Sequence, residues 1–177
     1  MSQFKPLLGA ALLAALGCTA PAGAADLLIT WPADWQVQPL PPGPEDNQAS
    51  RQRAVKNDAN GDPLMVVELT RTNLQPGHQV NLQAVLLEMR KSVQIHFSHG
   101  GYQSLCTRIH DSMLGDIPAL ETTCKIQLNG GHVMTQTLVA AAQQSAAYSL
   151  SYAGSAAGYD ATEEQVRGIR ASLKLLQ

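Results

Sequence analysis

The stretch that decides the fold is residues 119–155, ALETTCKIQLNGGHVMTQTLVAAAQQSAAYSLSYAGS. It contains three candidate strands, at 119–128, 132–142 and 147–155. Short joins separate them, Asn129-Gly130-Gly131 and Gln143-Gln144-Ser145. Joins this short connect strands that lie side by side and run antiparallel, so the stretch predicts a meander.

The same pattern continues upstream of the meander. Residues 102–110 predict a fourth strand directly before it. The pair Asn60-Gly61 lies between two further candidate strands, 51–56 and 63–70. Asn-Gly is a strong hairpin signal, because both residues tolerate positive φ. Two short strands are predicted nearer the start, at 27–32 and 35–38.

Two helices complete the predicted fold. Residues 82–97 carry apolar side chains at spacings of three and four, the pattern of one helix face, and Asn81 can cap the start. A closing helix is predicted from Asp160, because Glu163 stands at the capping-box spacing and apolar residues continue to Leu173. The order of strands, helix, meander and helix predicts an α+β fold, with an antiparallel sheet flanked by helices.

The first 25 residues have the pattern of a secretory signal. Lys5 precedes an apolar run at 7–17, and Ala22-Gly23-Ala24 offers the small-x-small pattern that a signal peptidase cuts. The run is shorter than the roughly 20 residues that a membrane-spanning helix needs. We therefore predict a signal peptide at 1–25, a single periplasmic domain at 26–177, and no transmembrane span once the signal is removed.

Cys18 offers an alternative processing site. It follows Ala15, Leu16 and Gly17, which loosely resembles the lipobox of bacterial lipoproteins. Cleavage before Cys18 would leave a lipid on this cysteine and anchor the protein to a membrane. Ala15 stands where a lipobox prefers leucine, so cleavage after Ala24 is the main prediction.

The two remaining cysteines predict a disulfide. Cys106 and Cys124 are equidistant from Gly115, in the turn between two candidate strands, which favours directly opposed positions on one hairpin. Disulfides persist in exported proteins. The alternation of apolar residues differs between the two strands, so a bulge or register shift is an open alternative. No C-x-x-C motif supports a redox pair.

The charge of the chain excludes one class of partner. Without Lys5, the only charge among the first 25 residues, 11 basic and 14 acidic residues remain, and they form no basic cluster. Nucleic-acid binding depends on neutralisation of phosphates by Lys and Arg, so nucleic acid is not predicted as a partner.

No catalytic or cofactor motif stands out. His96 and His99 have metal-compatible spacing near a helix end, but no third ligand is evident, although His110 and His132 exist elsewhere in the sequence. Two exposed histidines favoured by the helix dipole are the simpler interpretation. The sequence contains no nucleophile elbow or phosphate loop, and its acidic residues are scattered, so they give no basis for paired-carboxylate chemistry. We therefore predict no catalytic residue, bound metal or cofactor.

The chain resembles the PsbP-like superfamily. The resemblance lies in 114–119 (LGDIPA), in 147–152 (AYSLSY), in the closing helix that ends IRASL at 169–173, and in 29–35 (ITWPADW). The chain also resembles a group of small secreted proteins of unknown function in pseudomonads. The resemblance implies an α/β/α sandwich used by photosystem accessory and envelope proteins, and it supplies no active-site residues.

The leading functional hypothesis is a non-catalytic periplasmic protein that binds another envelope protein, with an inhibitor or immunity protein for a toxin enzyme as its sharpest form. Exposed loops commonly carry recognition. The predicted interface lies in residues 41–50 and 96–102, with these candidates: Pro41, Pro42, Glu45, Asp46, His96, His99 and Tyr102. One alternative is a lipid or small-ligand binder with an apolar pocket between the closing helix and the sheet. Another is a metal-dependent hydrolase that uses His96 and His99.

Overall fold

The computed structural model describes residues 27–41, 49–143 and 145–175. The predicted signal peptide and the candidate lipidation site Cys18 lie outside the described residues. Three candidate interface residues of the proline-rich loop also lie outside them, namely Pro42, Glu45 and Asp46.

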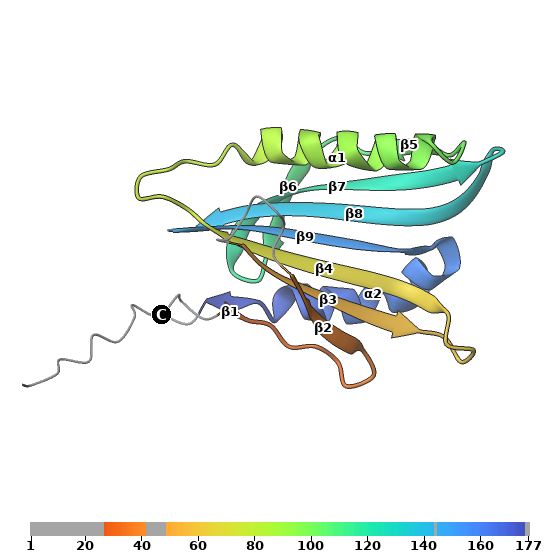
Figure 1. Ribbon diagram of the computed structural model, residues 1–177, viewed down its shortest axis with the longest axis horizontal. Helices are drawn as coiled ribbons and strands as arrows, with labels where there is room; N and C mark the ends of the chain where they lie inside the picture. Colours follow the sequence, from red (N-terminus) through yellow and green to blue (C-terminus); the bar gives the residue numbers. More distant parts are fainter. Residues whose placement is uncertain (1–26, 42–48, 144, 176–177) are drawn as a thin grey trace, which may run out of the picture.

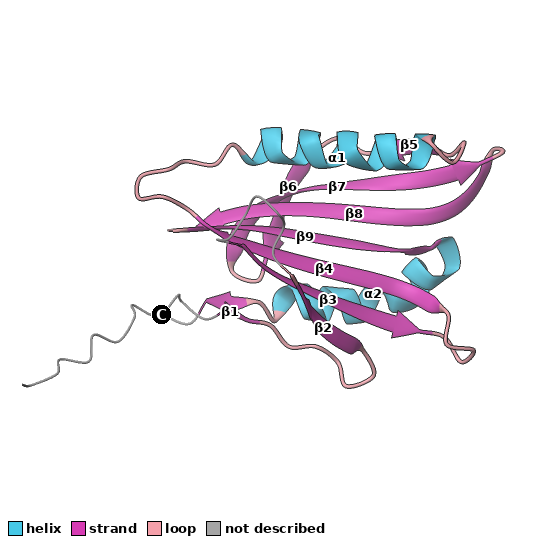
Figure 2. Cartoon of the chain, in the orientation of Figure 1, coloured by secondary structure: helices cyan, strands magenta, loops and turns pink. Residues whose placement is uncertain are grey.

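The described residues form ten strands and two helices (Figure 2). The strands are β1 (Leu27–Leu28), β2 (Gln36–Leu40), β3 (Ala49–Asn57), β4 (Pro63–Asn73), β5 (Gln103–Cys106), β6 (His110–Leu114), β7 (Ile117–Leu128), β8 (Gly131–Gln143), β9 (Ala146–Ser155) and β10 (Lys174–Leu175). The helices are α1 (Leu82–Ser98) and α2 (Ala156–Ala171). Neither described helix is long and apolar enough to cross a bilayer.

Eight strands form one antiparallel sheet in the order β2-β3-β4-β9-β8-β7-β5, with β6 also paired to β7. The predicted meander is present, because β7, β8 and β9 are consecutive neighbours. Strand β9 also pairs with β4, which joins the meander to the N-terminal hairpin. Figure 1 shows α1 beside β7 and β8, and α2 at the other side of the molecule, where it packs against β4, β8 and β9. The predicted α+β architecture is confirmed.

Each face of the sheet has its own apolar core. Successive strand residues point to opposite faces. Leu138 therefore joins the core that contains Leu86 of α1, whereas its neighbour Val139 joins the core that contains Ile169 of α2. Helix α1 contacts only β5, β7 and β8, so no described helix covers the same face of β9, β4 and β3.

The single strand predicted at 102–110 is wrong, since this segment forms parts of two strands. Both β5 and β6 pair with β7, but their registers differ by one residue. Cys106 lies opposite Cys124, whereas His110 lies opposite Glu121. The mismatched alternation in the sequence reflects this register shift.

The break between β5 and β6 is closed by hydrogen bonds and a disulfide. The Thr107 N–H donates to the Thr123 carbonyl at 2.9 Å, and the Thr107 hydroxyl accepts from the Thr123 N–H at 3.0 Å. One position away, Cys106 and Cys124 form the predicted disulfide between directly opposed residues. The disulfide therefore holds β5, and with it the chain that follows α1, on the edge of β7.

Helix α2 begins at Ala156, four positions before the predicted start at Asp160. Ser155 is the N-cap, and its hydroxyl accepts a hydrogen bond from the Gly158 N–H at 3.0 Å. A Cβ on Gly158 would lie 2.6 Å from the Leu64 carbonyl oxygen, so glycine is needed for this close packing against β4. The closing helix was expected to be the last element, but the short strand β10 follows α2 and pairs with β1.

Candidate functional site

A groove opens at the C-terminal end of α1, where the helix meets the β7–β8 hairpin. Its volume is about 390 Å³. We call it the aromatic groove, and it is lined by His96, Phe97, Gly100, Tyr102, Ile126, Leu128, Val133 and Met134.

Three rings form one wall of the aromatic groove. Gly101 adopts a φ of 77°, which turns the chain at the end of α1, and the Tyr102 N–H then donates to the Phe97 carbonyl at 3.2 Å. The Phe97 ring meets the Tyr102 ring edge to face, with centroids 5.9 Å apart, and the His96 ring at 5.3 Å. Edge-to-face contacts are a favourable aromatic arrangement, so these rings support one another.

The rest of the aromatic groove is aliphatic. Ile126 is fully buried at its floor, whereas Val133 on β8 is 38% exposed at its rim. Concave apolar surfaces with aromatic walls accept apolar groups, either of small ligands or of anchor side chains from partner proteins. His96 is exposed and is the one histidine among the lining residues, so the groove offers little polar chemistry.

A second feature is a polar cluster between α2 and the sheet. The Arg170 guanidinium lies 2.7 Å from the Glu121 carboxylate, and these side chains are only 17% and 14% exposed. The same guanidinium donates to the Tyr152 hydroxyl at 2.9 Å and to the Ser112 hydroxyl at 2.8 Å. Burial alone would lower the pKa of Arg170, but Tyr152 and Glu121 more than offset it, so the pKa is raised and the charge is held.

Tyr159 extends this polar cluster along the sheet. Its ring stacks on Tyr152 with centroids 5.7 Å apart, and its hydroxyl shares a hydrogen bond with Thr137. Burial, with a smaller contribution from Tyr152, raises the pKa of the Tyr159 phenol above its usual range. The cavity beside the cluster holds about 190 Å³ and includes charged residues such as Glu163 and Arg167 in its lining. This cavity between α2 and the sheet is thus partly charged, unlike the apolar pocket expected there for a lipid or small-ligand binder.

Comparison with known proteins places the chain in a family. Residues 26–175 match the family described as a domain of unknown function, DUF4946. The chain belongs to the DUF4946 family. No curated protein matches this DUF4946 chain.

Solved structures share the fold of this DUF4946 protein. The cyanobacterial PsbP protein CyanoP of Synechocystis sp. PCC 6803 matches with a TM-score of 0.59 at 10% identity, over 90% of this chain and 98% of that chain. LpqN, described as involved in cell envelope biogenesis of Mycobacterium tuberculosis, matches with a TM-score of 0.52 at 15% identity, over 90% and 88%. A protein of Bacteroides thetaiotaomicron VPI-5482 gives 0.53 at 10%, over 85% of this chain and 45% of that one. The resemblance to the PsbP-like superfamily is confirmed for the fold.

The structure brings together only part of the predicted interface. His96 and Tyr102 line the aromatic groove, whereas His99 is exposed and is not among the lining residues. Pro41 is exposed just after β2, which is the edge strand opposite β5. Pro41 therefore lies at the edge of the sheet opposite to the one that His96 and Tyr102 adjoin.

The described part of the chain contains no site that would support the metal-dependent hydrolase alternative. No group of three His, Cys, Asp or Glu side chains there could hold an ion. His110 Nδ1 lies 3.2 Å from the Arg108 carbonyl, and His132 Nε2 lies 2.9 Å from the Thr135 hydroxyl. Each of these histidines is thus engaged locally, and neither is brought to His96 and His99 in such a group.

Because the pKa of Tyr159 is raised, we expect the folded protein to lose stability at alkaline pH. The folded protein favours the neutral phenol, whereas the unfolded chain ionises near pH 10, the ordinary value for tyrosine. This contribution to stability is present below about pH 10 and is lost as pH rises toward the folded-state pKa. Urea unfolding between about pH 8 and pH 11 should show a falling free energy of unfolding, and Tyr159→Phe should flatten the slope. Tyr102→Phe, the matched loss of a phenol away from α2, should keep the slope; an unchanged slope in Tyr159→Phe would contradict the assignment.

Proposed function

We propose that this DUF4946 protein is a non-catalytic protein of the periplasm, and that it binds another envelope protein through the aromatic groove. The observation that carries the proposal is the groove itself, in which His96, Phe97 and Tyr102 form an aromatic wall over an aliphatic floor. Aromatic residues around a concave apolar site are enriched at the energetic centres of protein interfaces. An apolar anchor side chain of the partner would occupy this groove.

The polar cluster under α2 supports a structural role rather than a catalytic one. Arg170 bonds Glu121, Tyr152 and Ser112, so its donors are used within the protein. Tyr159 is likewise bonded to Thr137. The polar atoms of both residues are thus engaged within the protein, which favours a role in holding α2 on the sheet. We therefore keep the proposal non-catalytic.

The proposed location rests on the signal-like residues 1–25 and on the disulfide between Cys106 and Cys124. Disulfides persist outside the reducing cytoplasm. LpqN, whose description places it in envelope biogenesis, shares the fold, which agrees with an envelope role. The sharpest form of the proposal is an inhibitor or immunity protein, in which the bound partner is an enzyme that loses activity.

A charge at the groove rim tests the proposal. The protein, exported with a C-terminal tag, should capture one stoichiometric partner from envelope extract. Val133→Glu should then weaken binding of the purified partner at least tenfold, because the introduced carboxylate would be buried against apolar atoms. Val37→Glu on β2 is the matched control, since Val37 is 44% exposed and lies on the opposite edge strand. Equal affinity for the two variants would reject the aromatic groove as the interface. If the partner is an enzyme, its activity should fall in proportion to the complex formed.

A further inference from the structure

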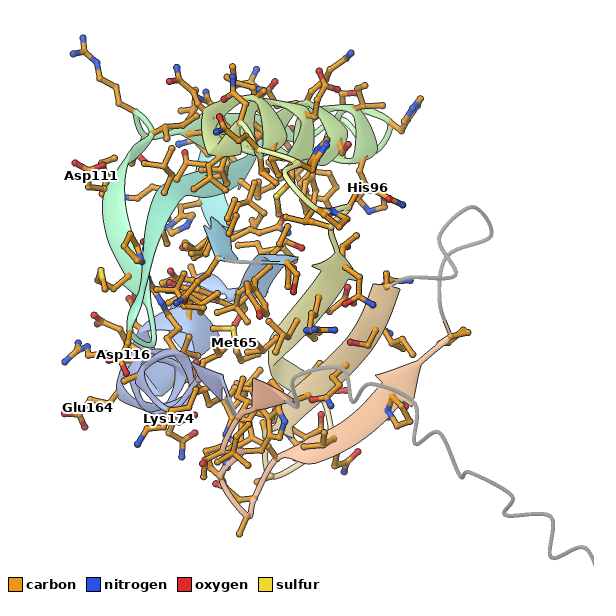
Figure 3. All side chains as sticks on the ribbon, turned by 90° about the vertical axis from the view of Figure 1, so that its left-hand side faces the viewer. Met65, His96, Asp111, Asp116, Glu164 and Lys174 are labelled. Atoms are coloured by element: carbon orange, nitrogen blue, oxygen red, sulfur yellow. A yellow bond between two sulfur atoms is a disulfide. The ribbon has the colours of Figure 1, made fainter. Side chains whose placement is uncertain are left out.

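A second cavity lies along the same side of α1 as the aromatic groove. It holds about 280 Å³ at the N-terminal end of the helix, and Val85 of α1 and Ala140 of β8 contribute to its lining. His96 and Met134 occupy the corresponding places in the aromatic groove. Val85 and His96 are eleven positions apart, three whole turns of helix, so they lie on one side of α1. Figure 3 shows His96 on the side of α1 toward β3 and β4, away from Asp111.

The distance between the two cavities can be estimated along the helix α1 or along the strand β8. Eleven helical residues rise about 17 Å, and the six strand residues from Ala140 to Met134 span about 20 Å. An extended peptide covers that distance with six residues, and side chains six positions apart point the same way. Two apolar anchors of one extended segment can therefore enter both cavities.

The strip of sheet between the cavities carries polar side chains beside the buried Leu138. Ser151 of β9 and Gln136 of β8 are on the face that α1 only partly covers, and both are half-buried. Hydroxyl and amide groups along this strip suit the backbone of a peptide, which needs hydrogen-bond partners. A continuous acyl chain would leave them unsatisfied. The observations thus favour a peptide over a lipid.

The far side of this strip is positively charged. Register places Arg51, Thr70 and Ser149 in one row across β3, β4 and β9, and Ser149 also lines the second cavity. In the next row, Arg53 donates to the Glu68 carboxylate at 2.7 Å, whereas the closest Arg51 nitrogen is 3.8 Å from it. Two guanidinium groups thus share one carboxylate, which leaves a net positive charge among these three side chains.

We infer that the partner presents an extended acidic segment to this protein, with two apolar residues six positions apart and an aspartate or glutamate between them. The segment lies along the strip of sheet between α1 and Arg51, with one anchor in the aromatic groove and the other in the second cavity. This inference rests on the proposed function and names the chemistry of the partner.

The test selects peptides without the natural partner. Random peptides of about twelve residues are displayed on phage, selected on the immobilised exported protein, and the enriched sequences are synthesised for affinity measurement. We expect paired apolar residues six apart around an acidic residue. Arg51→Gln should weaken these peptides about fivefold, as for loss of one partly exposed ion pair. Arg108→Gln, which removes an exposed arginine between β5 and β6, should leave affinity unchanged.

Two outcomes would overturn the inference. One is a set of peptides without the spaced pair, or with equal affinity for Arg51→Gln and Arg108→Gln. The other is an absence of enriched peptides together with saturable binding of cis-parinaric acid that Val133→Glu abolishes, which would assign the aromatic groove to a lipid. Either result leaves the proposed function to be judged by the captured partner, whose dependence on Val133 is measured separately.

Discussion

Arg170→Ala is expected to lower the free energy of unfolding by about 3–5 kcal/mol, the usual cost of removing one partner from a buried ion pair. The substitution leaves the Glu121 carboxylate, 14% exposed, without its cation. It also removes the hydrogen bonds to the Tyr152 and Ser112 hydroxyls, which join α2 to β9 and β6. Helix α2 would lose this polar attachment to β6, β7 and β9, and urea or thermal unfolding measures the loss directly.

The matched control is the exposed pair on the same helix. Arg167 and Glu163 lie 2.9 Å apart but are each about two-thirds exposed. Exposed pairs contribute between about 0 and 1 kcal/mol, so Arg167→Ala should be nearly neutral. The double replacement Glu121→Leu with Arg170→Met should recover much of the loss, since an apolar pair of similar size leaves no unpaired charge. Equal losses for Arg167→Ala and Arg170→Ala would show that burial does not decide the effect.

The polar cluster was not predicted from the sequence, although a signal was present. Arg170 directly follows the buried Ile169 on α2. Glu121 points to the same face of β7 as Ala119 and Thr123. Charged residues at core-facing positions are rarely buried unless they are paired. A search for two opposite charges at such positions could have joined Arg170 to Glu121 across 49 residues of chain.

Local chemistry explains what was predictable in the fold. The Asn81 cap, the Asn129-Gly130 turn and the short joins each act over a few residues, and the structure contains all of them. The pairing of β9 with β4 has no such signal, because it depends on which edge the finished meander offers to the hairpin. The same is true of the register shift between β5 and β6, which each strand alone does not reveal.

Only the part of the aromatic groove that comes from neighbouring residues could be predicted from the sequence. His96 and Tyr102 are near one another in sequence, so the segment could be singled out. Val133 and Met134 lie some 30 residues after Tyr102, on the β7–β8 hairpin, and only the fold brings them to α1. The second cavity combines the end of β4, the start of α1 and β9, and so required the long-range pairing.

Gly115→Ala is expected to destabilise the protein by more than about 3 kcal/mol, because two costs combine at one turn. Gly115 has a φ of 58°, and a residue with a Cβ pays about 1–2 kcal/mol there. A Cβ at this position would also lie 1.9 Å from the Leu173 carbonyl oxygen, so the β6–β7 turn must move away from the end of α2. That movement breaks the 2.8 Å hydrogen bond from the Gly115 N–H to the Arg170 carbonyl.

Gly130→Ala separates the contact from the backbone strain. Gly130 has a φ of 81° in the β7–β8 turn, and a Cβ there would meet no atom within 4 Å. This variant therefore pays only the cost of the left-handed conformation, about 1–2 kcal/mol. In a domain of this size each kcal/mol lowers the melting temperature by about 2–4 °C, so Gly115→Ala should melt several degrees below Gly130→Ala. Equal melting temperatures would mean that the turn does not rest on α2, and the turn's hydrogen bond to Arg170 could then no longer count as an attachment of that helix.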